Sequence, residues 1–183
     1  MNYWFTADCH FGHERMIQYA TRPFKDVNHM NESLIQRWND RVGTGDIVFH
    51  LGDFTYISSK FDMRSVINRL NGQIIFVRGN HDHNNSLETP IEDIHMIFGG
   101  KNLLLVHDPE SAIPGYDLVL CGHVHDLFRY RTYPYFEASY DVCNVGVDAW
   151  DFHPIKINEI LSGYAEWVKE GKWSNGFKKK REE

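Results

Sequence analysis

Five short apolar runs recur along the chain, and the order in which they alternate with other patterns constrains the fold more than any other feature. The runs are residues 3–7, 47–51, 74–77, 103–106 and 118–121. Each is about the length of a buried strand and is rich in β-branched, aliphatic or aromatic residues. Two amphipathic helical patterns lie between them, one through Leu34, Ile35, Trp38 and Val42, the other through Met63, Val66, Ile67 and Leu70 with Gly72 as a stop. Strands that alternate with helices predict an α/β fold.

The later part of the chain indicates further elements. Apolar positions between 157 and 167 predict a helix that Asn158 caps and that ends near Gly171. Residues 128–140 alternate aromatic and polar side chains, which predicts antiparallel strands or a hairpin, and hence a second sheet. Residues 144–148 have the pattern of another strand and loop, with no assigned role. We expect one domain over residues 1–171 and a charged, flexible tail over 172–183.

Length and composition are those of an ordinary globular domain. The 183 residues, 42% hydrophobic and 24% charged, suffice for one core and exclude a disordered chain. No run resembles a membrane span or a signal-peptide core, and three cysteines without a CxxC pair are typical of reduced thiols, so we expect a cytoplasmic protein. The net charge of −6 argues against extended nucleic-acid binding, which depends on Lys and Arg. A homo-oligomer is left open.

Polar side chains follow every predicted strand. They are Asp8 and His10, then Asp53, then Asn80 and His81, then His107, and finally His123 and His125. Because sites in α/β sheets lie outside the carboxyl ends of the strands, these residues are expected to converge on one cleft. Each has an ordinary alternative: Asp8 in a loop cap, Asn80 in a turn, His107 as a hydrogen-bonded core residue. Together they form the mixed nitrogen and oxygen donor set that Zn, Mn, Fe, Ni or Co accepts.

These motifs resemble those of the calcineurin-like metallophosphoesterases, small bacterial and phage members included. The resemblance is carried by Asp8-Cys9-His10, Gly52-Asp53, Gly79-Asn80-His81-Asp82, His107 and Gly122-His123-Val124-His125. It implies a four-layer α-β-β-α sandwich with two divalent metal ions. It also implies that Asp8, His10 and His125 hold one ion, that Asn80, His107 and His123 hold the other, and that Asp53 bridges them. His81 would then act on the leaving oxygen of the substrate as a catalytic residue.

The resemblance implies hydrolysis of a small phosphorylated substrate by in-line attack of a hydroxide held between the two metals. Asp53 continues into Phe54-Thr55, without the Asp-Arg-Gly extension of many protein phosphatases. This departure favours a phosphodiester or nucleotide-like substrate. The competing functions are a phosphomonoesterase or protein phosphatase of the same fold, a non-catalytic scaffold, and hydrolysis of a bond other than a phosphate ester.

Five further residues are candidates for substrate binding, each with an ordinary alternative. His13 lines the cleft or begins a helix, and Arg78 supplies a positive charge or sits in a salt bridge. Asp82 orients His81 or serves a turn. Arg129 and Tyr130 begin a segment that interleaves cations and aromatics, which suits base stacking but is more typical of a half-exposed hairpin.

Overall fold

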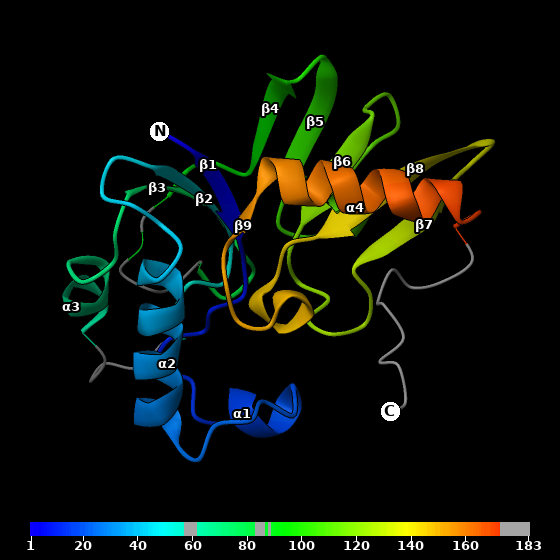
Figure 1. Cartoon of the computed structure of the whole chain (residues 1–183). Coiled ribbons are helices and arrows are strands. Elements are labelled where there is room, and N and C mark those ends of the chain that lie inside the picture. The colour runs from blue at the N-terminus through cyan, green and yellow to red at the C-terminus, as the bar shows by residue number, and fades with distance from the viewer. Residues whose placement is uncertain (57–61, 83–86, 88, 173–183) are drawn as a thin grey trace, which may run out of the picture.

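The computed structural model describes residues 1–56, 62–82, 87 and 89–172. Within them lie two β-sheets and a small number of helices (Figure 1). In this part of the chain no helix has the length and the apolar character that a bilayer crossing needs.

The first sheet has four strands and carries the first three predicted runs. In spatial order these are β3 (Gln73–Val77), β2 (Ile47–Leu51), β1 (Tyr3–Thr6) and β9 (Ile155–Lys156). The strands β1, β2 and β3 are parallel, so that Phe5 lies beside Phe49 and Phe49 beside Ile75, whereas β9 is antiparallel to β1. The carboxyl ends of the three parallel strands therefore meet at one edge.

The second sheet has five strands and carries the other two runs. In spatial order these are β4 (Asp93–Phe98), β5 (Lys101–Val106), β6 (Leu118–Cys121), β8 (Ala138–Asn144) and β7 (Tyr130–Tyr135). The inner strands β5, β6 and β8 are parallel, and the edge strands β4 and β7 are antiparallel to their neighbours. The predicted hairpin within residues 128–140 is confirmed as β7 and β8, and with it the second sheet.

The main core lies between the two sheets. Phe5, Phe49 and Leu51 from the first sheet share one buried cluster with Leu105 and Leu120 from the second. Helix α4 (Ile157–Lys169) adds Ile160 and Trp167 to the same cluster, and Figure 1 shows it lying across the second sheet. Full burial of each such side chain stabilises the fold by about 1.5–3 kcal/mol, which fixes the sheets relative to each other.

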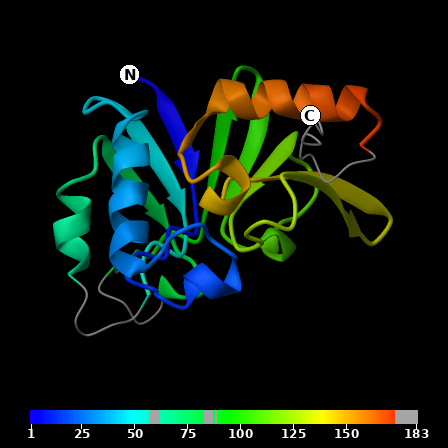
Figure 2. The same ribbon diagram turned by 60° about the horizontal axis from the view of Figure 1, so that its bottom comes forward.

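The outer faces of the sheets are also covered. Helix α2 (Val27–Asn39) and the short helix α3 (Met63–Ile67) pack on the first sheet, where Trp38 and Met63 join Trp4 and Val48 in a second cluster. Figure 2 shows these helices on the side of that sheet away from the second one. Phe128 packs on the outer face of the other sheet, and the short 3-10 turn η2 (Pro109–Ser111) lies beside it, where the Tyr140 hydroxyl donates to the carbonyl of Pro109. The predicted α/β class with two stacked sheets between helical elements is confirmed.

Two details differ from the expectation. The cap of α4 is Lys156, not Asn158, because Lys156 has extended backbone and its amide donates to the Glu159 carboxylate at 2.9 Å.

Strand β4 was not predicted, since its apolar residues alternate as Ile94, Met96 and Phe98, an edge-strand pattern rather than a continuous run. Of the expected tail, residues 173–183 lie outside the described part, and Lys172 bonds to the Asp141 carboxylate at 2.6 Å.

Candidate metal centre and cleft

The loops after β1, β2, β3, β5 and β6 bring the predicted polar side chains to the edge where the two sheets meet. Two groups of donor atoms are compact, each with all its atoms within 4.8 Å of one another. One group is Asp8, His10 and His125, and the other is Asp8, Asp53 and His107. The convergence expected from the strand ends is thus present in the fold, because both sheets direct parallel strands toward this edge.

Asp8 and His10 follow β1 and are almost completely buried. Both carboxylate oxygens of Asp8 accept from the backbone amide of His123 at 3.0 Å, and burial raises the pKa of Asp8. Among the described residues neither ring nitrogen of His10 has a hydrogen-bond partner. Burial lowers the pKa of His10 well below its usual value, so the ring is neutral and can donate a lone pair to a cation. An unpaired, neutral imidazole beside carboxylates is what a metal site requires.

Asp53 lies at the centre of the cluster. Its Oδ2 is 3.6 Å from Nε2 of His10 and 3.5 Å from Nε2 of His107. Its Oδ1 accepts from the backbone amide of His81 at 2.9 Å. Burial raises the pKa of Asp53, but the hydrogen bond and the charge of His107 lower it by more, so its pKa lies below the usual range. The carboxylate is therefore ionised and is shared between side chains from different loops.

Asn80, His107 and His123 form the other side of the centre. The amide oxygen of Asn80 is 2.9 Å from Nε2 of His107 and 3.0 Å from Nδ1 of His123. Nδ1 of His107 lies 2.8 Å from the carbonyl oxygen of Leu51, an arrangement that holds the proton on Nδ1 and directs Nε2 into the site. Burial lowers the pKa of His107, while the hydrogen bond to Asp53 and the charges of both aspartates raise it to about 9.

The backbone at the cluster is strained. Five of the predicted ligands have positive φ angles, which are Asp8 at 57°, His10 at 50°, Asp53 at 58°, His123 at 71° and His125 at 47°. Side chains other than glycine rarely adopt this region, and each instance costs on the order of 1–3 kcal/mol. A run of such angles at strand ends turns the side chains inward over the sheet edge, where the donor atoms meet.

Two glycines of the sequence motifs make room for the ligands. A Cβ on Gly52, whose φ is +88°, would overlap the ring of His107, and a Cβ on Gly79 would overlap the carboxylate of Asp53. Both positions therefore exclude any side chain, which explains physically why glycine precedes Asp53 and Asn80.

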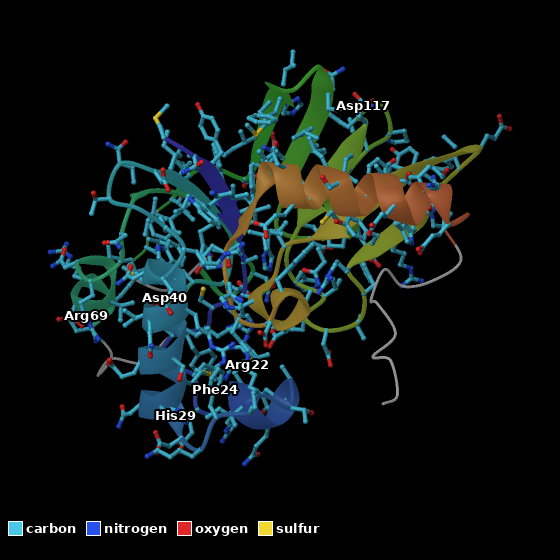
Figure 3. The ribbon with its side chains drawn as sticks, viewed as in Figure 1. Arg22, Phe24, His29, Asp40, Arg69 and Asp117 are labelled. Carbon is cyan, nitrogen blue, oxygen red and sulfur yellow. The ribbon has the colours of Figure 1, made fainter. Side chains whose placement is uncertain are left out.

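Two residues that support the centre were not assigned from the sequence. Asp148, in the 3-10 turn η3 (Val147–Trp150), accepts from Nδ1 of His125 at 2.8 Å and from Nε and an Nη of Arg22, both at 2.8 Å. Arg22 also donates to the backbone carbonyls of Asp8 at 2.7 Å and Cys9 at 3.0 Å. Figure 3 shows Arg22 between helix α1 (Met16–Tyr19) and η3. Asp148 follows the end of β8, so the rule that sites lie at the carboxyl ends of strands would have found it. The sequence around Arg22 contains no comparable signal.

A cleft of about 390 Å³ opens beside the centre. It is lined by His10, His13, Met16, Tyr19, His81, His123, Val124, His125, Asp126 and Leu127. The half-buried ring of His81 has its Nε2 4.0 Å from Oδ2 of Asp53. His13 lies on the ring of Tyr56, with 3.9 Å between centroids and 11° between planes, and burial lowers its pKa to about 4. The structure therefore brings both His13 and His81 to the cleft.

The other candidate substrate residues have structural partners. Oδ2 of Asp82 accepts from the backbone amides of Asp53 and Gly79, both at 2.8 Å, which is the turn role. Arg78 forms an ion pair with Glu92, and it borders a second cavity of about 390 Å³ that Asn80 and His107 also line.

Arg129 and Tyr130 are not among the residues that line the cleft. The Tyr130 hydroxyl donates to the carbonyl of Ile160 at 2.9 Å, and its buried ring packs on Trp167 in the main core. The Arg129 guanidinium lies 4.0 Å from the ring centroid of Trp150 and donates to the carbonyl of Ala149. Their alternation of cation and aromatic ring serves the packing of β7 against α4 and η3, and not base stacking in the cleft.

Comparison with known proteins agrees with this architecture. The chain is 34% identical over 158 residues to an uncharacterized protein of Methanocaldococcus jannaschii, covering 85% of this chain and 86% of the relative. It is 30% identical to the gene 66 protein of Mycobacterium phage L5, covering 61% of this chain and 53% of that protein. A crystal structure of a protein of unknown function from Aquifex aeolicus shares the fold, with a TM-score of 0.67, 23% identity, and coverage of 88% of this chain and 98% of that one. The family model described as "Calcineurin-like phosphoesterase superfamily domain" matches residues 1–147, and the chain therefore belongs to the calcineurin-like phosphoesterase superfamily.

Proposed function

We propose that this protein is a two-metal phosphoesterase that hydrolyses a phosphodiester or a nucleotide-like phosphate ester. The ligands would be Asp8, His10 and His125 for one ion, Asn80, His107 and His123 for the other, and Asp53 between them. Imidazole, carboxylate and amide donors fit Mn, Fe, Zn, Ni or Co. When bound, two such ions supply an activated water nucleophile and neutralise charge on the phosphate oxygens.

The position of Asp53 carries the proposal. One ionised oxygen of a nearly buried carboxylate lies within 4.0 Å of a ring nitrogen from each of three histidines, on the loops after β1, β3 and β5. A single carboxylate shared in this way is suited to bridging two cations, and the neutral ring of His10 completes a shell without adding charge. A scaffold protein has no need for such a strained and desolvated cluster.

His81 is the proposed proton donor to the leaving oxygen. Its backbone amide is fixed by Asp53, while its ring is partly exposed and faces the cleft. A side chain that is held at its backbone and partly exposed at its ring is placed to reach a substrate oxygen.

The preference for a diester is inferred from charge. The residues that line the cleft include no Lys or Arg, and Asp126 adds a carboxylate. A diester carries one negative charge fewer than a monoester dianion, so it requires less positive charge from the protein. A phosphomonoesterase or protein phosphatase of the same fold is the competing function.

The test uses two substrates with one leaving group. The purified protein is stripped of metal with a chelator, reloaded in turn with Mn, Fe, Zn, Ni and Co, and assayed on bis(p-nitrophenyl) phosphate and p-nitrophenyl phosphate. We expect activity to vanish on stripping and to return with at least one metal, with a higher kcat/KM for the diester. Full activity of the stripped protein would exclude the two-metal function, and a clear monoester preference would exclude only the diester assignment.

A further inference from the structure

The cleft beside His81 has two kinds of lining residue. Histidines of the metal centre form part of the lining, and apolar side chains add Met16 and Tyr19 from α1 and Val124 and Leu127 from the loop after β6. Tyr19 and Leu127 are each 67% exposed. Two large side chains with apolar surface that are exposed to water at one cleft are stabilised when a ligand covers them.

Aromatic rings connect Tyr19 to the metal centre. The ring centroid of His13 is 6.2 Å from that of Tyr19, with the planes at 80°, and 5.5 Å from that of His10. Tyr56 lies flat against His13 and 6.0 Å from the ring of His81. The orientation of His13 is therefore fixed by stacking on Tyr56, and its ring contacts both His10 of the metal centre and Tyr19 of α1.

The charge of the lining residues limits what they can bind. The residues that line this cleft include no Lys or Arg, so a second phosphate group or an acidic peptide would meet no countercharge there. The volume of about 390 Å³ lies at the lower end of the ~300–1,000 Å³ typical of small-molecule sites. The group next to the phosphate is thus expected to be compact, uncharged and able to contact apolar surface.

We propose that the part of the cleft lined by Tyr19 and Leu127 is a subsite for a planar aromatic ring, a nucleobase, carried by the phosphate ester. This subsite rests on the proposed function in placing the phosphate at the metal centre, and it names the residues that would select the substrate. The aromatic residues after His125 were one candidate for base stacking, but Tyr130 is buried in the core. The proposed subsite instead uses α1 and the loop between β6 and β7, which line the cleft.

The experiment measures binding and not turnover, so that it is independent of the hydrolytic activity. Titration calorimetry on the metal-loaded protein compares AMP with ribose 5-phosphate, which carry the same phosphate and differ by the base. We expect AMP to bind about tenfold more tightly, since stacking of one base contributes roughly that much. Tyr19→Ala and Leu127→Ala should each reduce this ratio toward one while leaving the Kd of ribose 5-phosphate unchanged.

Two controls make the result specific. Tyr19→Phe keeps the ring and should keep the ratio, and Phe136→Ala removes an exposed aromatic ring from the β7–β8 turn and should have no effect. Equal affinities of the wild-type protein for the two ligands, or a ratio that neither alanine variant changes, would overturn the subsite. An absence of hydrolysis with the ratio intact would overturn the proposed function and leave the subsite standing.

Discussion

His10 illustrates how much of the centre depends on single residues. Its ring is buried, and without a cation neither nitrogen has a hydrogen-bond partner among the described residues. A buried polar group left unpaired costs about 1–3 kcal/mol. The backbone of His10 is also in the left-handed region, which adds strain. A cation bound at a ring nitrogen would offset the cost of the unpaired imidazole, which supports the proposed metal site.

The substitution His81→Ala distinguishes a loss of catalytic rate from a loss of metal binding. The ring of His81 lines the cleft, and the substitution keeps the hydrogen bond from its backbone amide to Asp53 while removing the ring nitrogen that lies 4.0 Å from the Asp53 carboxylate. We expect kcat to fall by ~10²–10⁴, the range for loss of a general acid, with metal content near that of the wild type. Steady-state kinetics together with metal analysis of the same preparation provide the measurement. A loss of metal larger than the loss of rate per bound metal would reassign His81 as a ligand.

Among the elements, the strand-end loops could be placed from the sequence and the supporting contacts could not. Short apolar runs followed by Asp8 or Asp53 identify a parallel strand and the edge where it ends. Arg22 acts on Asp8 through the backbone, and on Asp148 across 126 positions of the chain, so no local pattern marks it. For Tyr130 the sequence left both base stacking and hairpin packing open, because alternation cannot distinguish the cleft-facing side of a hairpin from the side that packs on α4.

Asp148→Asn tests the link between η3 and the loop after β1. The carboxylate pairs with Arg22 inside the protein, where both side chains are at most 2% exposed. Breaking a buried ion pair leaves an uncompensated charge, so the free energy of unfolding should fall by about 3–5 kcal/mol. Loss of the bond to His125 should also weaken metal affinity by about 10–100-fold. Urea unfolding and metal titration measure the two effects.

A matched control is the exposed pair of Glu32 and Arg69, which has two hydrogen bonds of 2.6 and 2.8 Å. Glu32→Gln should change stability little because solvent screens the pair. Equal losses in the two variants would contradict the proposed role of Asp148.

On the scale of the whole molecule, the centre lies on the seam between the two sheets. Asp8, His10, Asp53 and Asn80 follow strands of the first sheet, whereas His107, His123 and His125 follow strands of the second. Each proposed ion would therefore be held by residues from both sheets, and its binding would oppose their separation.

Metal removal should lower the thermal stability of the entire fold and not of one loop. A ligand at 100 times its Kd stabilises the native state by about 2.7 kcal/mol, which corresponds to a rise in Tm of several degrees for a domain of this size. Calorimetric scans of the stripped and the reloaded protein measure the difference in Tm. This difference should be smaller for Asp53→Asn than for the wild type. The same Tm with and without metal would contradict a cation held between the sheets.

The seam has a consequence for the order of events when the protein is made. The amide of His123 and the carboxylate of Asp8 are 115 positions apart, and Asp148, which orients His125, comes later still. A ribosome that has released only β1, β2 and β3 presents Asp8 and His10 without His125, so the growing chain holds no complete set of donors. The proposed metals would therefore bind only after the second sheet and η3 have emerged and packed on the first three strands, which would make metal uptake a late step of maturation.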